Sequence, residues 1–334
     1  MIVTKEIKRD AVFDIVRALC IIEIVCFWHL KEYLDISMVP HKLIWFCGNI
    51  TGTILGTFTF MSAFFLKRKK MESLRDVKTF YLNRLKRFWL LYFIASLLLY
   101  VASSFAGQPW YSSFSNFILS LLGLSIFFSP LPSTLWYMVM LMFFYIITPP
   151  ILYVKTQMKR LRFIVCILFA FILLNHLGWL DERVLYYFPM YVLGLIIPDR
   201  FINNTIKSNY KIAILSCVIY IICLYLVNNN LVRTLLLCFV GVPIVIYIST
   251  LLAKSNIIKS FSTYISYSSL NMYLFHRHIY LFFLILWNIG KLSNIREATF
   301  PLWLVIVVWP FIIVSSYYIQ KIYDCIIMDR IFKK

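Results

Sequence analysis

The first apolar segment of the chain, Ala11–Leu30, carries ionisable side chains that a membrane helix rarely tolerates. On insertion scales such a group costs about 2.5–3.5 kcal/mol in hydrocarbon, so each one is a candidate functional residue. Asp14 and Arg17 are three positions apart and can pair on one helix face, or they can anchor the helix at the membrane interface. Glu23 is then either protonated, paired across helices or turned toward a wet cavity.

A histidine follows in the same segment. His29 comes twelve positions after Arg17, which places it about 18 Å further along a helix. A neutral imidazole, with an unperturbed pKa of about 6.5, is suited to removing a proton from a hydroxyl. Glu32, one turn later, could orient the ring. The alternative is a purely structural histidine at a helix end.

A second polar group lies in a later apolar segment, Tyr267–Trp287. His276 and Arg277 fall near its middle, one turn after Tyr273. A histidine–arginine pair at that depth is expected to face other helices rather than lipid. The pair belongs either to a functional site or to a structural hydrogen-bond network between helices.

The stretch Lys67–Arg87 holds nine basic residues. That charge is sufficient as a topology signal, because short cytoplasmic loops are enriched in lysine and arginine. A sharper role is binding phosphate groups, for which the forked donors of Arg84 and Arg87 are better suited than lysine. Lys67 and Arg68 open the same stretch.

The composition requires a membrane environment for these residues. Hydrophobic residues make up 62% of the 334 positions and charged residues only 14%, whereas soluble domains carry about 25% charged residues. The net charge of +19 is confined to short loops, so we exclude nucleic-acid binding. The cysteines lack metal-ligand spacing, and we expect no metal site.

We therefore predict an all-α fold: a polytopic membrane helix bundle of about ten transmembrane helices, forming a single domain over residues 1–334. The basic N-terminus, Lys5–Arg9, predicts a cytoplasmic start, and the basic loops are satisfied when both termini are cytoplasmic. Phe114–Ser129 is short and contains Gly123, so we interpret it as a re-entrant or interfacial segment. The other basic loops are Lys155–Arg162, Asp199–Lys211 and Lys254–Lys259.

Several stretches together resemble the acyltransferase-3 family of membrane acyltransferases, many of which O-acetylate bacterial surface glycans. The stretches occur in the order typical of the family and cover most of the chain: Phe13–Leu19 (FDIVRAL) followed by His29, Phe58–Leu66 (FTFMSAFFL), Phe80–Tyr92 (FYLNRLKRFWLLY), Leu135–Pro149 (LWYMVMLMFFYIITP) and Tyr267–His276 (YSSLNMYLFH).

The resemblance implies transfer of an acyl group, acetyl being the simplest, from cytoplasmic acyl-CoA to a hydroxyl of an extracytoplasmic glycan or glycolipid. Acyl-CoA would be the co-substrate, with its phosphates at Arg84, Arg87, Lys67 and Arg68. The catalytic group would be His29 with Arg17, Asp14 and Glu32. The acceptor, a surface glycan or a lipid-linked saccharide, would meet Trp136, Tyr273, His276 and Arg277.

The departures from the family pattern include one spacing and one residue type near the candidate site. The family usually separates its arginine and histidine by ten residues, but eleven lie between Arg17 and His29, and twelve helical steps leave the two side chains about 120° apart. Either the two side chains face different directions, or a π-bulge in the first helix realigns them. Thr134 precedes Leu135 where many members have histidine.

The same charged residues could instead line a transporter or flippase for a lipid-linked glycan, although no internal repeat favours it. For either function the expected location is the cell (plasma) membrane, with multiple passes and in contact with membrane lipid. The abundance of Ile, Lys, Asn and Tyr is compatible with a bacterial source, and a homo-oligomer is compatible with the sequence.

Overall fold

The computed structural model describes residues 10–29, 40–69, 71–105, 113–128, 131–132, 134–289 and 303–326. Over these ranges every regular element is a helix, in agreement with the predicted all-α class. Glu32 and the basic stretch Lys5–Arg9 lie outside the described residues, as do both termini. The predicted cytoplasmic position of the termini therefore stays a prediction.

The helices follow one another with short connections. In chain order the elements, of which those marked η are π-helical, are α1 (Ala11–Ile22), η1 (Glu23–Trp28), α2 (His41–Leu66), α3 (Leu74–Arg84), η4 (Leu85–Trp89), α4 (Leu90–Phe105), α5 (Phe114–Leu121), α6 (Ser125–Phe128), α7 (Trp136–Tyr153), α8 (Gln157–His176), α9 (Arg183–Ile196), α10 (Asp199–Phe201), η5 (Ile202–Ile206), α11 (Tyr210–Leu226), α12 (Asn230–Leu252), α13 (Asn256–Ile289), η7 (Leu304–Val308) and α15 (Trp309–Tyr323).

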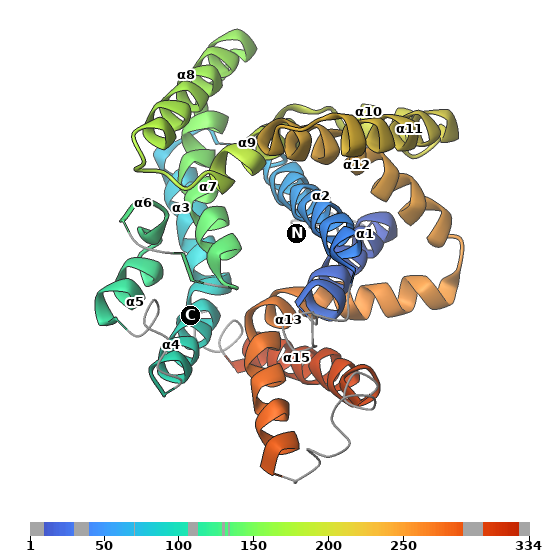
Figure 1. The fold of residues 1–334 in the computed structure, drawn as a ribbon. Helices are drawn as coiled ribbons and strands as arrows, with labels where there is room; N and C mark the ends of the chain where they lie inside the picture. The colour runs from blue at the N-terminus through green and yellow to red at the C-terminus, as the bar shows by residue number, and fades with distance from the viewer. Residues whose placement is uncertain are drawn as a thin grey trace, which may run out of the picture.

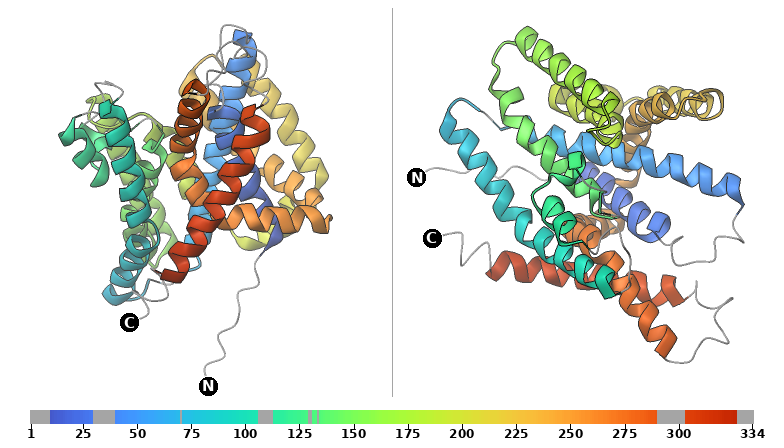
Figure 2. Two further views of the ribbon diagram at one scale, coloured as in Figure 1. Left: turned by 90° about the horizontal axis from the view of Figure 1, so that it is seen from below. Right: turned by 60° about the vertical axis from the view of Figure 1, so that its left-hand side comes forward.

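Figure 1 shows α1 and α2 at the centre of the bundle. The helix α1 packs along α13 and α12, and α2 packs against α9 and α12. The helices α3 and α7 stand on one side of this pair, and α13 and α15 close another. In Figure 2 the long helices α2, α4 and α15 run roughly alongside one another. Asp14 and Arg17 therefore lie on a central helix, α1, and His276 and Arg277 lie on α13, which packs along it.

The described residues include five helices that are long and apolar enough to cross a membrane, or six if a pair bent by 91° counts as one span. These are α2, the continuous helix from Leu74 to Ala102, α7, α12, the helix from Leu304 to Ile326, and the bent pair α10–η5 with α11. The chain is thus a multi-helix membrane protein by length and composition, while the count of ten spans stays a prediction.

Several predicted boundaries were wrong because charged helical turns do not show as apolar runs. The predicted loop Lys67–Arg87 is helical from Leu74 onward, since Ser73 and Asp76 form a reciprocal capping box there. The predicted loops Asp199–Lys211 and Lys254–Lys259 likewise contain helical turns, including the start of α13. Consequently Arg84 and Arg87 are held on a rigid helix instead of a loop.

The segment Phe114–Ser129, described as far as Phe128, is helical but interrupted, and its re-entrant or interfacial position stays a prediction. It forms two short helices, α5 and α6, which are separated near Gly123. Gly123 has a φ of 74°, a left-handed conformation that glycine adopts without the penalty a side chain would impose. Neither helix is long enough to cross a hydrocarbon core of about 30 Å.

The bundle has two distinct ends. At what we call the basic end, Lys67 and Lys207 contact the rings of Phe64 and Phe13, and the Tyr323 hydroxyl donates to a carbonyl oxygen of the α3–α4 helix. Arg84 and Arg87 also lie at the basic end. The opposite end, the His29 end, holds His29 and the first turns of α2, α7 and α12.

Candidate functional site

Two buried histidines from distant parts of the chain meet at the His29 end. The Nδ1 atom of His29, which follows η1, lies 2.8 Å from the Nε2 atom of His276 on α13. Their rings stack with centroids 4.7 Å apart. Only 9% of His29 and none of His276 is exposed. The predicted catalytic and acceptor-side histidines therefore form one pair.

The surroundings of His276 fix the protons of this pair. Its Nδ1 atom lies 3.0 Å from the carbonyl oxygen of Met272 and 2.8 Å from that of Tyr273. Carbonyl oxygens only accept hydrogen bonds, so Nδ1 of neutral His276 carries the hydrogen and its Nε2 is an acceptor. His29 must then donate from Nδ1, which leaves a lone pair on its own Nε2.

A π-helical turn places His29 in this position. The element η1, Glu23–Trp28, adds one residue to the helical ladder between Arg17 and His29. Twelve sequence positions then span about eleven helical steps, which reduces the angular offset from about 120° to about 20°. Arg17 bonds Ser266 and His29 bonds His276, both on α13. Of the two alternatives, the π-bulge is the one observed.

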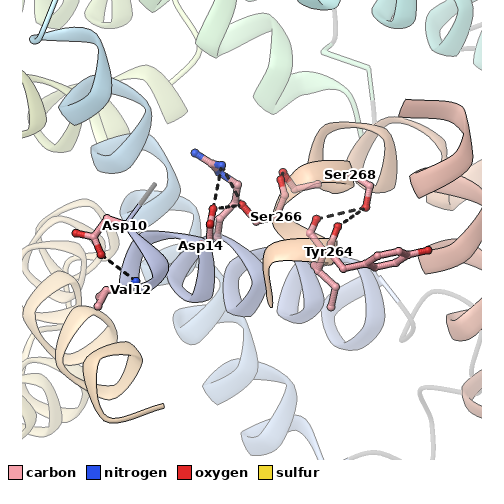
Figure 3. A network of polar contacts seen from close by, with 9 residues as sticks. Asp10, Val12, Asp14, Tyr264, Ser266 and Ser268 are labelled. Atoms are coloured by element: carbon pink, nitrogen blue, oxygen red, sulfur yellow. Dashed lines mark hydrogen bonds and ion pairs between the residues drawn. The ribbon is translucent and has the colours of Figure 1, made fainter. Parts of the chain in front are cut away.

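Arg17 and Asp14 form a network with α13. In Figure 3, Asp14 and Ser266 point toward one another from the two helices. The Ser266 hydroxyl donates to Asp14 Oδ1 over 2.7 Å, and Arg17 Nη1 donates to the same hydroxyl oxygen over 3.0 Å. The predicted Asp14–Arg17 pair is present at 3.9 Å. Asp14 is buried, so this network holds the Arg17 guanidinium in place.

Arg17 lines a cavity of about 430 Å³ that opens between α1, α2, α3, α7 and α13. Arg84 and Arg87 line it at the basic end, and Tyr273 lines it toward the His29 end. His276 lies one turn beyond Tyr273 on α13, about 4.5 Å along the axis. The cavity thus reaches from two arginines to within a helical turn of the histidine pair. A volume in this range is typical of small-molecule sites.

The arginines at the mouth of the cavity are suited to an anion. Arg84 rests against the rings of Phe80 and Tyr145, 5.6 Å and 5.2 Å from the ring centroids. Its buried Nε has no hydrogen-bond partner among the described residues. Nearby, burial lowers the pKa of Lys69, and the positive charges of Arg84 and Arg87 lower it further. The local potential is therefore positive.

The other two predicted phosphate-binding residues lie beside the cavity and not on it. Lys67 Nζ is 2.6 Å from Asp199 Oδ1, and Arg68 Nη2 is 3.2 Å from Asp199 Oδ2. Neither is among the described residues that line the cavity. Their charge is largely compensated by Asp199, which the sequence analysis did not connect to them.

The predicted acceptor residues occupy the region between the cavity and the His29 end. The Tyr273 hydroxyl donates to the carbonyl oxygen of Thr134, and Arg277 Nη1 donates to the Thr134 hydroxyl over 2.9 Å. Trp136 does not line the cavity; its ring lies 4.7 Å from the Arg183 guanidinium. The structure thus joins Tyr273, His276 and Arg277 in one region and places Trp136 at its edge.

The sequence analysis missed several polar residues of the site. Ser266, Ser62, Tyr137 and Tyr145 contact Arg17 or line the cavity. Hydroxyl groups are ordinary in membrane helices, so nothing in their spacing distinguished them. Glu23, left open between three interpretations, accepts a 2.7 Å hydrogen bond from the Thr51 hydroxyl of α2 and is thus paired across helices.

Comparison with protein-family models matches residues 10–319 to an acyltransferase domain, that of the acyltransferase-3 family. The chain belongs to the acyltransferase-3 family. Searches of the curated proteins and of the solved structures each found no match. The match runs from α1 into α15 and includes every described site residue named in this section.

Membership of the acyltransferase-3 family makes the protein a transferase of acyl groups and, with its apolar helices, a multi-pass membrane protein. His29 and Arg17 stand in the first-helix signature of the family, and Thr134 stands where many members have histidine. In this chain Arg277 donates a hydrogen bond to the Thr134 hydroxyl, and the Tyr273 hydroxyl donates one to the Thr134 carbonyl oxygen. Among the described residues, no cluster of His, Cys, Asp or Glu is arranged to hold a metal ion.

Proposed function

We propose that this acyltransferase-3 protein transfers an acyl group, acetyl the simplest, from cytoplasmic acyl-CoA to a hydroxyl of an extracytoplasmic glycan or glycolipid. The observation that carries the proposal is the continuity of the cavity: it begins at Arg84 and Arg87 and ends a turn from the His29–His276 pair. A donor with anionic phosphates and a long neutral arm fits a site that is cationic at one end and apolar along its walls.

The donor end of the proposal rests on charge and geometry. The phosphates of acyl-CoA bind Arg84 and Arg87 at the mouth, where forked guanidinium donors match phosphate oxygens. The pantetheine arm passes between Phe58, Leu141 and Tyr137, which line the cavity. The thioester carbonyl then lies beyond Arg17, near Tyr273 and toward the histidine pair. Lys67 and Arg68, which pair with Asp199, supply background positive charge only.

The chemical step uses the lone pair on His29 Nε2. His29 accepts the proton of the acceptor hydroxyl as that oxygen attacks the thioester carbonyl carbon. The C–S bond breaks, the new ester C–O bond forms, and the leaving thiolate takes the proton from His29. His276 keeps the other nitrogen of His29 protonated throughout, in the way that a positioned partner sets the tautomer of a catalytic histidine.

The experiment uses the purified full chain, acetyl-CoA and a panel of candidate glycans, with release of the CoA thiol as the readout. We expect His29→Ala to lower CoA release on the order of 10²–10⁴-fold, the usual contribution of a positioned general base. His176→Ala is the control, because His176 is an exposed histidine outside the site. Full CoA release by His29→Ala would remove His29 from the chemistry.

A further inference from the structure

A second cavity lies at the His29 end, where the beginning of α2 faces the end of α11 and the beginning of α12. It has a volume of about 800 Å³ and is lined by the first turns of α2 and by the connection between α11 and α12. Its lining combines two cations with aromatic and aliphatic side chains: Pro40, Lys42, Leu43, Trp45, Phe46, Leu224, Tyr225, Val227, Asn228 and Arg233.

Arg233 is held at this cavity by several hydrogen bonds. Its Nε donates to Asn49 Oδ1 over 3.2 Å, its Nη1 to the Val227 carbonyl oxygen over 3.3 Å, and its Nη2 to Asn230 Oδ1 over 2.8 Å. The guanidinium carbon also lies 5.4 Å from the centroid of the Trp45 ring. A guanidinium has five N–H donors, so this one is fixed in place and still has two to offer.

The described side chains that line this cavity include two cations, Lys42 and Arg233, and no carboxylate. All three acceptors of Arg233 are neutral, and no carboxylate among the described residues lies within ion-pair distance of Arg233 or Lys42. A fixed, partly buried guanidinium is a preferred partner for phosphate oxygens. The cavity is therefore built for an anion.

The apolar half of the cavity indicates what the anion is attached to. Leu43 and Tyr225 are 50% and 66% exposed, and they continue into a row of exposed aliphatic residues on α11 that includes Ile221 and Ile222. The helix α2 has the length and composition of a membrane span, and α11 reaches them together with the bent segment α10–η5 that precedes it. An apolar chain bound here would lie along α11 in the lipid.

We infer that the cavity between α2, α11 and α12 binds the phosphate head group of a membrane amphiphile, with the phosphate on Arg233 and Lys42 and the chain along α11. The site is separate from the acyl-CoA cavity, and the inference does not depend on the acyl-transfer proposal. A snorkelling role for Arg233 fits less well, because its three hydrogen bonds turn the guanidinium inward onto the protein.

Direct binding tests the inference. The purified full chain is titrated with phosphatidic acid, with phosphatidylcholine and with soluble glycerol phosphate, and lipid-bound protein is counted by native mass spectrometry. We expect phosphatidic acid to bind in preference to phosphatidylcholine, because its monoester phosphate offers more acceptors to Arg233. Binding should weaken roughly tenfold to a hundredfold in Arg233→Gln, as expected for losing a hydrogen-bonded charge. Lys42→Gln changes an exposed side chain and disturbs no described hydrogen bond, and it should weaken the binding of phosphatidic acid several-fold.

Arg160→Gln is the matched control. Arg160 is also half-buried and donates to a carbonyl oxygen six residues earlier, that of Val154, but it lines neither cavity. Equal losses in Arg160→Gln and Arg233→Gln would overturn the site, as would absence of any lipid binding or unchanged binding in Lys42→Gln and Arg233→Gln. If soluble glycerol phosphate binds as tightly as phosphatidic acid, the inference that the ligand is a membrane amphiphile is overturned. Acyl transfer can fail or succeed in the same protein without affecting these readouts.

Discussion

At the scale of single residues, the site depends on which nitrogen of each histidine carries a proton. The carbonyl oxygens of Met272 and Tyr273 fix the hydrogen of neutral His276 on Nδ1. The 2.8 Å bond between the rings then fixes the hydrogen of His29 on its own Nδ1. His276 is therefore a positioning residue in the proposed reaction. It sets the tautomer of His29 without touching the substrate.

Substituting His276 tests that positioning role. In His276→Phe the ring volume is kept but the acceptor is lost, and we expect kcat to fall on the order of 10²-fold, within the contribution of general-base catalysis. In His276→Gln an amide oxygen can accept from His29 Nδ1, and we expect most of the activity to return. The KM for acyl-CoA should change little in both variants, because Arg84 and Arg87 lie at the far end of the cavity.

The measurement is steady-state CoA release at varied acyl-CoA concentration. Equal activity in the Phe and Gln variants would contradict the positioning role, since only one of them offers an acceptor. A large rise in KM would show that His276 instead belongs to the donor site.

The sequence singled out Asp14, Arg17, His29 and His276 because each is expensive in hydrocarbon. In the structure Asp14 and Arg17 form one contact with α13, and His29 forms another. The sequence did not identify Ser266, whose hydroxyl links Asp14 to Arg17. Serine and threonine in a helix commonly bond their own backbone, as Ser62 does to the Phe58 carbonyl oxygen, so their types carry no functional signal.

At the scale of elements, the π-helical turn η1 determines whether Arg17 and His29 of the first-helix motif face the same neighbouring helix, α13. A π-turn adds a residue to the ladder and is often found at functional sites. Its presence reconciles the extra residue between Arg17 and His29 with a shared face toward α13. The sequence could pose this alternative from spacing alone, but the choice depends on packing against α13, which spacing does not contain.

Changing the length of η1 tests this reading. Deleting Val25 leaves eleven steps between Arg17 and His29, which a regular helix turns to within about 20°, so we expect at least a tenth of the CoA-release activity to remain. Inserting one alanine after Val25 adds about 100° of rotation, and we expect activity to be lost. Both changes disturb the same buried turn, so each is the control for the other. Retention by the insertion and loss by the deletion would contradict the role of η1.

The contact between α2 and α9 depends on a glycine. A Cβ added at Gly194 would lie 2.3 Å from the Phe60 carbonyl oxygen and 2.9 Å from the Ala63 Cβ, so the helices would have to separate. We expect Gly194→Ala to reduce the free energy of unfolding by roughly 1–3 kcal/mol, the usual cost of overpacking. Small residues allow membrane helices to approach closely, which is the physical reason for this glycine.

The matched variant is Gly52→Ala in α2, where the nearest atom would be 3.8 Å away and the substitution fits. Thermal unfolding in detergent, followed by intrinsic tryptophan fluorescence, compares the two. A melting temperature for Gly194→Ala equal to that of the unsubstituted protein would show that α9 can shift at no cost.

The predicted helical structure was right over the described residues. The predicted first residues of helices were wrong where the first turns of a helix carry charged or polar side chains. The helix that carries Arg84 begins at Leu74, with a capping box as its signal, and its first turns are too polar to appear in an apolar pattern. The same holds for the polar first turns of α13. Membrane prediction finds where a helix enters hydrocarbon, whereas capping decides where it begins.

At the scale of the whole molecule, the two ends of the bundle differ in charge and in chemistry. The basic end gathers Lys67, Arg68, Arg84 and Arg87 around the mouth of the first cavity, and the His29 end holds the histidine pair and the second cavity. Lysine and arginine gather on the cytoplasmic side of membrane proteins. If the basic end is cytoplasmic, as the sequence predicts, the proposed donor site lies where acyl-CoA is present and the histidines lie toward the outer side.

Sidedness can be tested with single added cysteines. Glu72 lies at the basic end and His41 at the His29 end, and both are exposed and outside the site. In intact cells, a membrane-impermeant maleimide should label His41→Cys above the unsubstituted protein, whose eight native cysteines set the background. Glu72→Cys should be labelled above that background only after permeabilisation, because positive charge retains the basic end inside. The reverse pattern would place Arg84 and Arg87 outside the cell, away from acyl-CoA. The proposed direction of transfer would then be wrong, although the helix bundle and the histidine pair would stand.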